Sequence, residues 1–181
     1  MIIVEGPDGS GKTTLIKHLQ SIATFYMYHS KGPVTDLKDG LMRTNALYTY
    51  PFNSIMDRCV LISEPIYGPI VRNIDIFDQH LTGLWQRLKE KIDPTIIMCS
   101  PPYDTAEENI KNIEEVYNKS WKTDDHLDLV IKKYKLLLIK YDDIYARLVD
   151  MKFNVLLYKY TYTKMDYLEN YLLWRGELCA D

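Results

Sequence analysis

The stretch of sequence that decides the fold is Gly6-Pro7-Asp8-Gly9-Ser10-Gly11-Lys12-Thr13. It satisfies the pattern G-x-x-x-x-G-K-[ST], whose glycines let backbone N–H groups turn towards phosphate oxygens. A short apolar run precedes it at residues 1–5, and apolar residues recur on one helical face from residue 12 to about residue 23. We therefore expect a strand, a phosphate-binding loop and a helix in succession, the context in which this motif indicates a nucleoside-triphosphate site.

The residue types in this loop divide the task of holding a triphosphate and its metal ion. Lys12 brings a full positive charge to the β- and γ-phosphates, and the hydroxyl of Thr13 suits Mg²⁺. The start of the following helix adds the positive end of its dipole. The residues expected to hold ATP are Gly6, Asp8, Gly9, Ser10, Gly11, Lys12, Thr13 and Thr14.

Strand and helix patterns alternate along the rest of the chain. This alternation predicts an α/β three-layer sandwich, in which a five-stranded parallel sheet is covered by helices on both faces. Ligands of such sheets gather beyond the carboxyl ends of the strands. We expect further strands at residues 25–29, 54–57, 95–100 and 154–160, and further helices at 36–48, 78–91, 124–150 and 165–175.

Length and composition narrow the class of protein. The 181 residues, 46% of them hydrophobic, suffice for one core, so we expect a single domain over residues 1–181. The formal net charge is only −3, which creates no field that would hold a polyanion, and we expect no nucleic-acid partner. The three cysteines lack disulfide or metal spacing, and no leader or membrane-spanning run is found. We expect a cytoplasmic protein outside the membrane.

Phosphate loops of this kind serve GTPases, motors and kinases, so other residues have to separate these classes. The nearest match to a guanine-reading N-K-x-D signature, at residues 118–121, ends in Trp121 instead of aspartate. The expected fourth strand ends at Cys99-Ser100, without the acidic residue that commonly holds magnesium in motor ATPases. An aspartate does end the expected third strand, at Asp57, and a kinase is the class that fits best.

A set of motifs outside the general loop pattern is informative about the kind of kinase. The loop has the form G-x-D-G-x-G-K-[ST]-T because Asp8 stands in it, Asp57-Arg58 ends the third expected strand, and S-E-x-x-Y-G occurs at residues 63–68 with Arg72 one helical turn beyond. This set resembles the thymidylate kinase family of nucleoside monophosphate kinases, especially its small phage-encoded members, over nearly the whole chain. Ser63 stands one residue further from Asp57 than the family usually places it.

The resemblance implies roles for individual residues. Asp8 would contact the 3′-hydroxyl of the acceptor sugar, Arg58 would bind phosphate with its planar fork, and Asp57 would organise magnesium and the acceptor end. The residues expected to take part in catalysis are Lys12, Asp57, Arg58 and Asp8. The residues expected to bind the acceptor are Asp8, Arg58, Glu64, Tyr67, Arg72 and His29, and those expected to hold the metal are Thr13 and Asp57.

The family also carries a helical lid and commonly forms homodimers. The lid would lie at about residues 103–125, where this chain has no arginine, so we name Lys119 and Lys122 as the charges that would act there. A homodimer is the expected assembly. Leu84, Trp85 and Leu88 are candidates for its contact face, and the same apolar spacing also fits positions in the core.

The activity that the resemblance implies is transfer of the γ-phosphoryl group from magnesium-ATP to a nucleoside monophosphate, with dTMP or a related pyrimidine deoxynucleotide as the expected acceptor. Alternatives remain open. A deoxynucleoside kinase would need a general base, for which Glu64 and Asp57 are candidates. A phage kinase that acts on hydroxymethyluracil is a further alternative. Because the expected lid has no arginine, a non-catalytic ATP-binding module is also an alternative.

Overall fold

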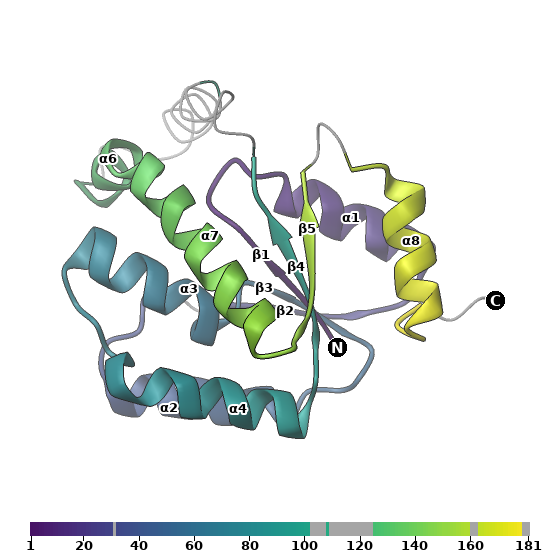
Figure 1. The fold of residues 1–181 in the computed structure, drawn as a ribbon, viewed down its shortest axis with the longest axis horizontal. Coiled ribbons are helices and arrows are strands. Elements are labelled where there is room, and N and C mark those ends of the chain that lie inside the picture. Colours follow the sequence, from purple (N-terminus) through teal and green to yellow (C-terminus); the bar gives the residue numbers. More distant parts are fainter. Residues whose placement is uncertain (31, 102–107, 109–124, 160–162, 179–181) are drawn as a thin grey trace.

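A five-stranded parallel sheet forms the centre of the protein (Figure 1). The structure is a computed structural model that describes residues 1–30, 32–101, 108, 125–159 and 163–178. The strand order is β2-β3-β1-β4-β5, and every pairing is parallel. These observations confirm the predicted α/β class. The strands are β1 (Ile2–Glu5), β2 (Tyr26–His29), β3 (Ser54–Asp57), β4 (Thr95–Cys99) and β5 (Asn154–Tyr158).

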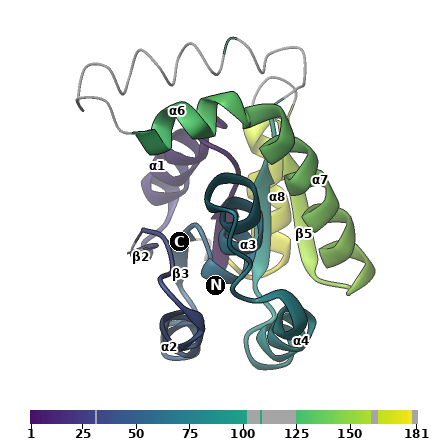
Figure 2. The same ribbon diagram turned by 90° about the vertical axis from the view of Figure 1, so that its left-hand side faces the viewer.

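Helices cover both faces of the sheet (Figures 1 and 2). The central strand β1 is buried over its whole length and sends alternate side chains into two apolar clusters, Ile3 into one and Ile2 and Val4 into the other. The first cluster includes residues of α2 (Leu37–Leu47), α3 (Val60–Tyr67), α4 (Leu81–Lys91) and α7 (Tyr134–Asp150), and the second residues of α1 (Lys12–Ile22) and α8 (Met165–Trp174).

Helix α3 was not predicted from the sequence, because Pro65 lies inside it and Gly68-Pro69 follow it. A proline at position 65 cannot donate to the carbonyl of Leu61, one turn earlier. The indole Nε1 of Trp85, on α4, donates to that carbonyl instead, at 2.8 Å. A π-helical turn, Gly68–Arg72, continues α3, so a distant side chain stabilises a helix that the local sequence disfavours.

The expected helices at 124–150 and 78–91 also differ in detail. The first is interrupted at Lys133 into α6 (Asp125–Lys132) and α7, and the ammonium of Lys133 donates to the carbonyl of Ile70 in the π-helical turn. The second begins with a short 3₁₀ turn, Asp78–His80, before α4. Strand β5 ends at Tyr158, and residue 160 of the expected strand lies outside the described residues.

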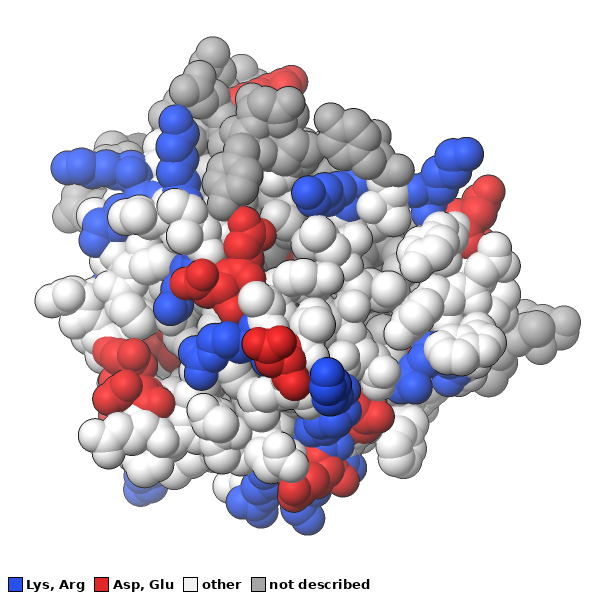
Figure 3. Space-filling model, viewed as in Figure 1, with Lys and Arg blue, Asp and Glu red and all other residues white. Residues whose placement is uncertain are grey.

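The residues chosen as a dimer contact face lie mainly in the core. Trp85 and Leu88 are fully buried under α4, and Leu84 packs against the same cluster. The apolar stripe of α4 therefore covers the sheet, so of the two positions that the spacing of these residues allowed, they take the one in the core. On the face shown in Figure 3, Lys and Arg side chains alternate with Asp and Glu. In the described part of the chain, no helix has the length and apolar character needed to cross a membrane.

Candidate functional site

The carboxyl ends of three neighbouring strands bring the candidate residues to one edge of the sheet. In the parallel register His29 of β2 lies opposite Asp57 of β3, and Asp57 lies opposite Val4 of β1. The phosphate loop, residues 6–14, begins one residue after β1 ends at Glu5. His29, Asp57 and the loop therefore meet at the end of the sheet where parallel α/β folds bind ligands.

Two glycines of the phosphate loop occupy backbone positions that favour glycine. Gly6 has φ 147°, and a Cβ atom there would lie 2.2 Å from the carbonyl oxygen of Cys99 on β4. Gly11 caps the start of α1 with φ 82°, in the left-handed region. The loop therefore lies tightly against β4 and turns directly into a helix N-terminus, the geometry that favours bound anions.

The side chain of Lys12 is held inside this loop. Its Nζ donates to the carbonyls of Gly6 at 2.9 Å and Pro7 at 2.7 Å, and the residue is 8% exposed. Burial, followed by the nearby charge of Arg58, lowers the pKa of the Lys12 ammonium to about 8. Thr13 and Thr14 lie in the exposed first turn of α1.

The loop and its surroundings fit a nucleoside triphosphate with its magnesium ion. Ser10 Oγ and Asp57 Oδ1 are both buried, and neither has a hydrogen-bond partner among the described residues. Unpaired buried oxygens are costly unless a ligand or water satisfies them. A carboxylate oxygen is a hard ligand that Mg²⁺ prefers, directly or through water, so Asp57 and the hydroxyl of Thr13 are suited to hold the metal.

Asp8 forms the centre of a polar cluster that joins the loop to β3 and α3. Its carboxylate pairs with Arg58 Nη2 at 2.5 Å and accepts from the hydroxyl of Tyr67 at 3.3 Å. The guanidinium of Arg58 also lies over the Tyr67 ring, 4.8 Å from its centroid. Arg58 and Asp8 remain 22% and 27% exposed, so this cluster reaches the surface of the site.

Helix α7 contributes two tyrosines to the same cluster. Tyr134 donates its hydroxyl to the backbone carbonyl of Asp8 at 2.8 Å. Tyr141, two turns further along the same helical face, packs edge-on against Tyr67 with ring centroids 6.5 Å apart. Both tyrosines fall on the apolar face of the helix expected at residues 124–150, and nothing in their helical spacing distinguishes a core position from one under the loop.

Arg58 reaches Asp8 from a strained backbone. Its φ of 67° places a residue with a full side chain in the left-handed region, at a cost of about 1–2 kcal/mol. Hydrogen bonds hold the backbone on both sides: Arg58 N donates to the carbonyl of Val4 at 3.0 Å, and Cys59 N donates to the carboxylate of Glu5. Such strain, held in place by its surroundings, occurs often at functional sites.

His29 and Asp57 form a second polar pair at the edge of the site. His29 Nδ1 lies 3.2 Å from Asp57 Oδ2, and the His29 ring is 68% exposed. The two residues come from adjacent strands and lie opposite each other in the register. An exposed imidazole beside a carboxylate can accept or release a proton.

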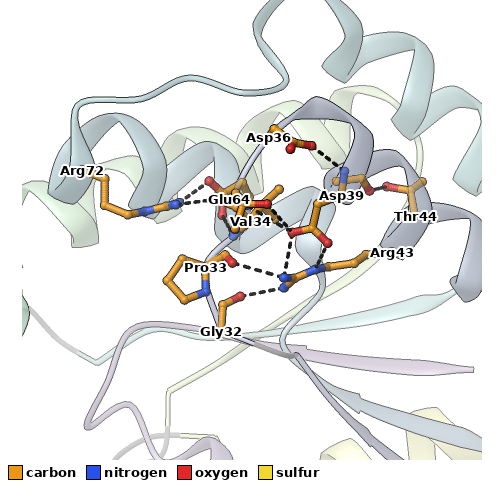
Figure 4. A network of polar contacts seen from close by, with 11 residues as sticks. Gly32, Pro33, Val34, Asp36, Asp39, Arg43, Thr44, Glu64 and Arg72 are labelled. Carbon is orange, nitrogen blue, oxygen red and sulfur yellow. Dashed lines mark hydrogen bonds and ion pairs between the residues drawn. The ribbon is translucent and has the colours of Figure 1, made fainter.

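Glu64 and Arg72 form an ion pair that holds the loop between β2 and α2 (Figure 4). Arg72 Nη1 donates to the carbonyl of Val34 at 3.0 Å, and the Val34 N–H donates to Glu64 Oε2 at 3.3 Å. The pair thus satisfies both backbone groups of Val34. Glu64 is 6% exposed and Arg72 17%, so these two predicted acceptor residues are engaged mainly with the protein itself.

A second ion pair, Asp39 with Arg43 on α2, holds the same loop from the other side (Figure 4). Arg43 donates to the carbonyls of Gly32 at 2.8 Å and Pro33 at 3.2 Å. We call residues 32–34 the arginine-held loop, because the carbonyls of all three residues are bound by guanidinium groups. Arg43 was not predicted as a site residue, because an i, i+4 Asp–Arg pair on a helix is typical of a solvated surface.

The structure thus brings together Asp8, Lys12, Asp57, Arg58 and Tyr67 around the phosphate loop. Glu64 and Arg72 instead bind the backbone of Val34 in the arginine-held loop. Lys119 and Lys122, and the lid expected at residues 103–125, fall almost entirely outside the described residues. Sequence reasoning missed Glu5, whose signal was a charged residue at the end of an apolar strand.

Comparisons with known proteins support the fold. No protein-family model matches the chain, and no curated protein matches it in sequence. The YorR protein from Bacillus subtilis, solved in complex with phosphorylated GDP, superposes with a TM-score of 0.66 at 14% identity, covering 97% of this chain and 95% of its own. Deoxyadenosine kinase from M. mycoides, with bound dATP, superposes with a TM-score of 0.59 at 16% identity, covering 95% of this chain and 98% of its own.

Polyphosphate Kinase 2 from Arthrobacter aurescens TC1 gives a TM-score of 0.56 at 18% identity, over 80% of this chain and 55% of its own. The chain therefore has the fold of P-loop kinases. Two of these structures are named for different kinase activities, and the likeness does not single out thymidylate kinase.

Proposed function

We propose that the protein is a kinase that transfers the γ-phosphoryl group of magnesium-ATP to a nucleoside monophosphate, with a pyrimidine deoxynucleotide such as dTMP as the preferred acceptor. The observation that carries the proposal is the Asp8 cluster. A carboxylate inside a phosphate loop would repel a triphosphate, and here it is paired with Arg58 and bonded to Tyr67, at the side where a second ligand would approach.

The phosphate loop would hold the donor. Its backbone N–H groups and the start of α1 would bind the phosphates, and Lys12 would leave the carbonyls of Gly6 and Pro7 to contact the β- and γ-phosphates. Thr13 and Asp57 would hold the magnesium ion, which neutralises charge on the phosphate oxygens when it is bound. The burial of Lys12 strengthens its attraction for a phosphate because little water screens it.

The Asp8 cluster would place the acceptor. Asp8 would accept from the sugar 3′-hydroxyl while Arg58 donates to the acceptor phosphate, so the phosphate oxygen faces the γ-phosphorus in line with the leaving oxygen. A bond forms between that oxygen and the γ-phosphorus, and the bond to the bridging oxygen of ADP breaks. The acceptor phosphate is already ionised, so no general base is needed, and the main requirements are position and charge neutralisation.

A deoxynucleoside kinase is a second candidate, favoured by the His29–Asp57 pair. A nucleoside offers a hydroxyl, which has to lose its proton as it attacks. The pair lies at the carboxyl ends of adjacent strands beside the loop, and its carboxylate or imidazole is a suitable proton acceptor. The solved deoxyadenosine kinase shares the fold.

The test is to incubate the protein with magnesium-ATP and a panel of deoxynucleoside monophosphates, deoxynucleosides and hydroxymethyluracil-containing DNA. ADP release would be followed and products identified by mass. We expect ADP only with monophosphates, most strongly with dTMP. Lys12→Ala serves as the control for contaminating kinases, because a true signal must disappear in that variant.

Other outcomes would change the assignment. Phosphorylation of a deoxynucleoside, lost in Asp57→Asn, would move the protein to the second candidate. A product in the DNA fraction would indicate a modified-base kinase. Slow ADP release that no acceptor accelerates would contradict transfer and favour an ATP-binding module.

A further inference from the structure

Glu5 is a carboxylate in a position where charge is costly. It ends β1, directly before the phosphate loop, and is 0% exposed. Burial, partly offset by the charge of Arg58, raises the pKa of the Glu5 carboxyl to about 7. A residue that carries such a cost needs partners that satisfy its oxygens.

The partners of Glu5 come from separate parts of the site. Oε1 accepts a short hydrogen bond from the backbone N–H of Cys59, in the turn after β3. Oε2 accepts from the N–H of Gly6, the first residue of the phosphate loop, and from the hydroxyl of Tyr141 on α7, each at 3.4 Å. One side chain therefore links the loop, the turn and α7 beneath the cluster around Asp8.

The strained residue of the site lies between these bonds. Arg58 adopts φ 67°, and the N–H that follows it, on Cys59, is the one bound by Glu5. The preceding bond, from Arg58 N to the carbonyl of Val4, ties the same turn to β1. The guanidinium of Arg58 points back over the loop to Asp8, so a rotation of this turn would withdraw it from the site.

We infer that Glu5 is a positioning residue for phosphoryl transfer: its carboxylate ties the start of the phosphate loop to the turn after β3 and holds Arg58 in the backbone conformation from which it reaches Asp8. The inference rests on the proposed function, in which Arg58 binds the acceptor. Glu5 itself touches neither ligand and acts through Arg58.

The first arm of the test needs no activity. Hydrogen exchange of the amides of Arg58 and Cys59 would be measured in the wild type and in Glu5→Met, which fills the same space without an acceptor oxygen. We expect exchange to rise about tenfold or more at Cys59, whose hydrogen bond to Glu5 is lost, and to rise also at Arg58, because the turn that carries its bond to Val4 is no longer held by Glu5. Glu5→Asp, whose shorter side chain cannot reach Cys59, takes its place should the methionine variant fail to fold.

Two further variants serve as controls. Glu5→Gln keeps an oxygen that accepts from Cys59, so most of the protection should return. Ser54→Ala removes a partly buried hydrogen bond, from Ser54 Oγ to the carbonyl of Pro51, at the opposite end of β3. It should leave exchange at Arg58 and Cys59 as in the wild type. Unchanged exchange in folded Glu5→Met and Glu5→Asp would overturn the inference.

The second arm is a double-mutant cycle on kcat/KM for the acceptor. Glu5→Met should lower it about 10- to 100-fold with little change in the KM for ATP. In an Arg58→Ala background the same change should cost less than about threefold, because a residue that acts through Arg58 has nothing left to position. Losses that multiply independently would overturn the inference.

The two arms separate this inference from the proposed function. A wild-type protein that phosphorylates no acceptor would contradict the function, and hydrogen exchange would still decide whether Glu5 holds the turn. Active wild type with unchanged exchange would contradict the inference alone.

Discussion

The phosphate loop and the arginine-held loop are built in different ways. The phosphate loop is one continuous stretch whose ligand groups are mostly backbone N–H groups and one lysine. The arginine-held loop, residues 32–34, is placed by side chains from three elements, with each guanidinium paired to a carboxylate. The comparison teaches that the proposed donor side depends on local backbone shape, whereas the proposed acceptor side depends on ion-paired arginines that reach the loop from other elements.

This difference predicts how each side responds to substitution. A change of charge in the phosphate loop removes a group that meets the reacting phosphates and should lower turnover. A change in the ion pairs of the arginine-held loop moves a wall of the site and should alter acceptor binding. The predictions below run from the largest expected effect to the smallest.

Lys12→Ala should lower phosphoryl transfer by about 10³-fold or more, because it removes the ammonium that would meet the β- and γ-phosphates. The fold should remain, since the hydrogen bonds of this side chain within the described residues go to the loop carbonyls of Gly6 and Pro7. Transfer would be measured with radiolabelled ATP and folding by circular dichroism. Full activity in a natively folded variant would contradict the donor assignment.

Glu5→Gln should change how the stability of the protein depends on pH. The variant tests the carboxylate that links the phosphate loop, the turn after β3 and α7. The pKa of Glu5 is raised from 4.5 to about 7 in the folded protein, so between these values the folded state holds a proton that the unfolded state has lost. Wild-type stability should therefore fall relative to the glutamine variant as pH rises from about 4.5 to 7, by about 3 kcal/mol.

The measurement is urea unfolding of both proteins at several values between about pH 5 and pH 8. Arg58, Lys12 and Tyr141 face this carboxyl and are present in both proteins, so their own titration largely cancels in the difference. A stability difference that does not vary with pH would show that Glu5 does not titrate in this range.

Arg58→Lys should lower kcat/KM for the acceptor about 30- to 100-fold, since a lysine keeps the charge and loses the planar fork. The KM for ATP should stay within about threefold of the wild-type value, because Arg58 lies on the Asp8 side of the loop. Steady-state kinetics with each substrate varied in turn give both numbers. A larger effect on ATP than on the acceptor would reverse the assignment of the two sides.

Arg43→Lys should raise the KM for the acceptor by up to about tenfold with kcat little changed, because lysine cannot hold the carbonyls of Gly32 and Pro33 together. Arg87→Lys, on α4, is the matched control: this arginine packs over Tyr48 and has no contact with the arginine-held loop among its described interactions. Equal effects of the two substitutions would mean that the loop does not shape the site.

The sequence predicted the phosphate loop and the parallel sheet because the signals for both lie within short stretches of the chain. Residues 6–13 carry their own turn chemistry, and the period of apolar residues identifies each strand. Asp57-Arg58 could be placed because it follows a strand. These features need no knowledge of which distant residue lies nearby.

The parts that were missed depend on contacts between distant residues. Helix α3 has a proline inside it, and the indole of Trp85 that satisfies Leu61 lies 24 positions away along the chain. Arg43 has the sequence pattern of a surface residue. Its contacts with the carbonyls of Gly32 and Pro33 become visible only in the structure. Glu5 could be noticed as a charge after apolar residues, but its partners in the turn and in α7 become visible only once the sheet is assembled.

The left-handed backbone of Arg58 has a consequence for how this protein would evolve. Glycine and asparagine adopt that conformation more readily than arginine does. A library of variants selected only for staying folded should therefore accumulate these residues at position 58, whereas selection for phosphoryl transfer should retain arginine. At the neighbouring buried position of Leu61, both selections would favour the same apolar side chain, so sequencing the two populations would reveal which positions serve the reaction and which serve the fold.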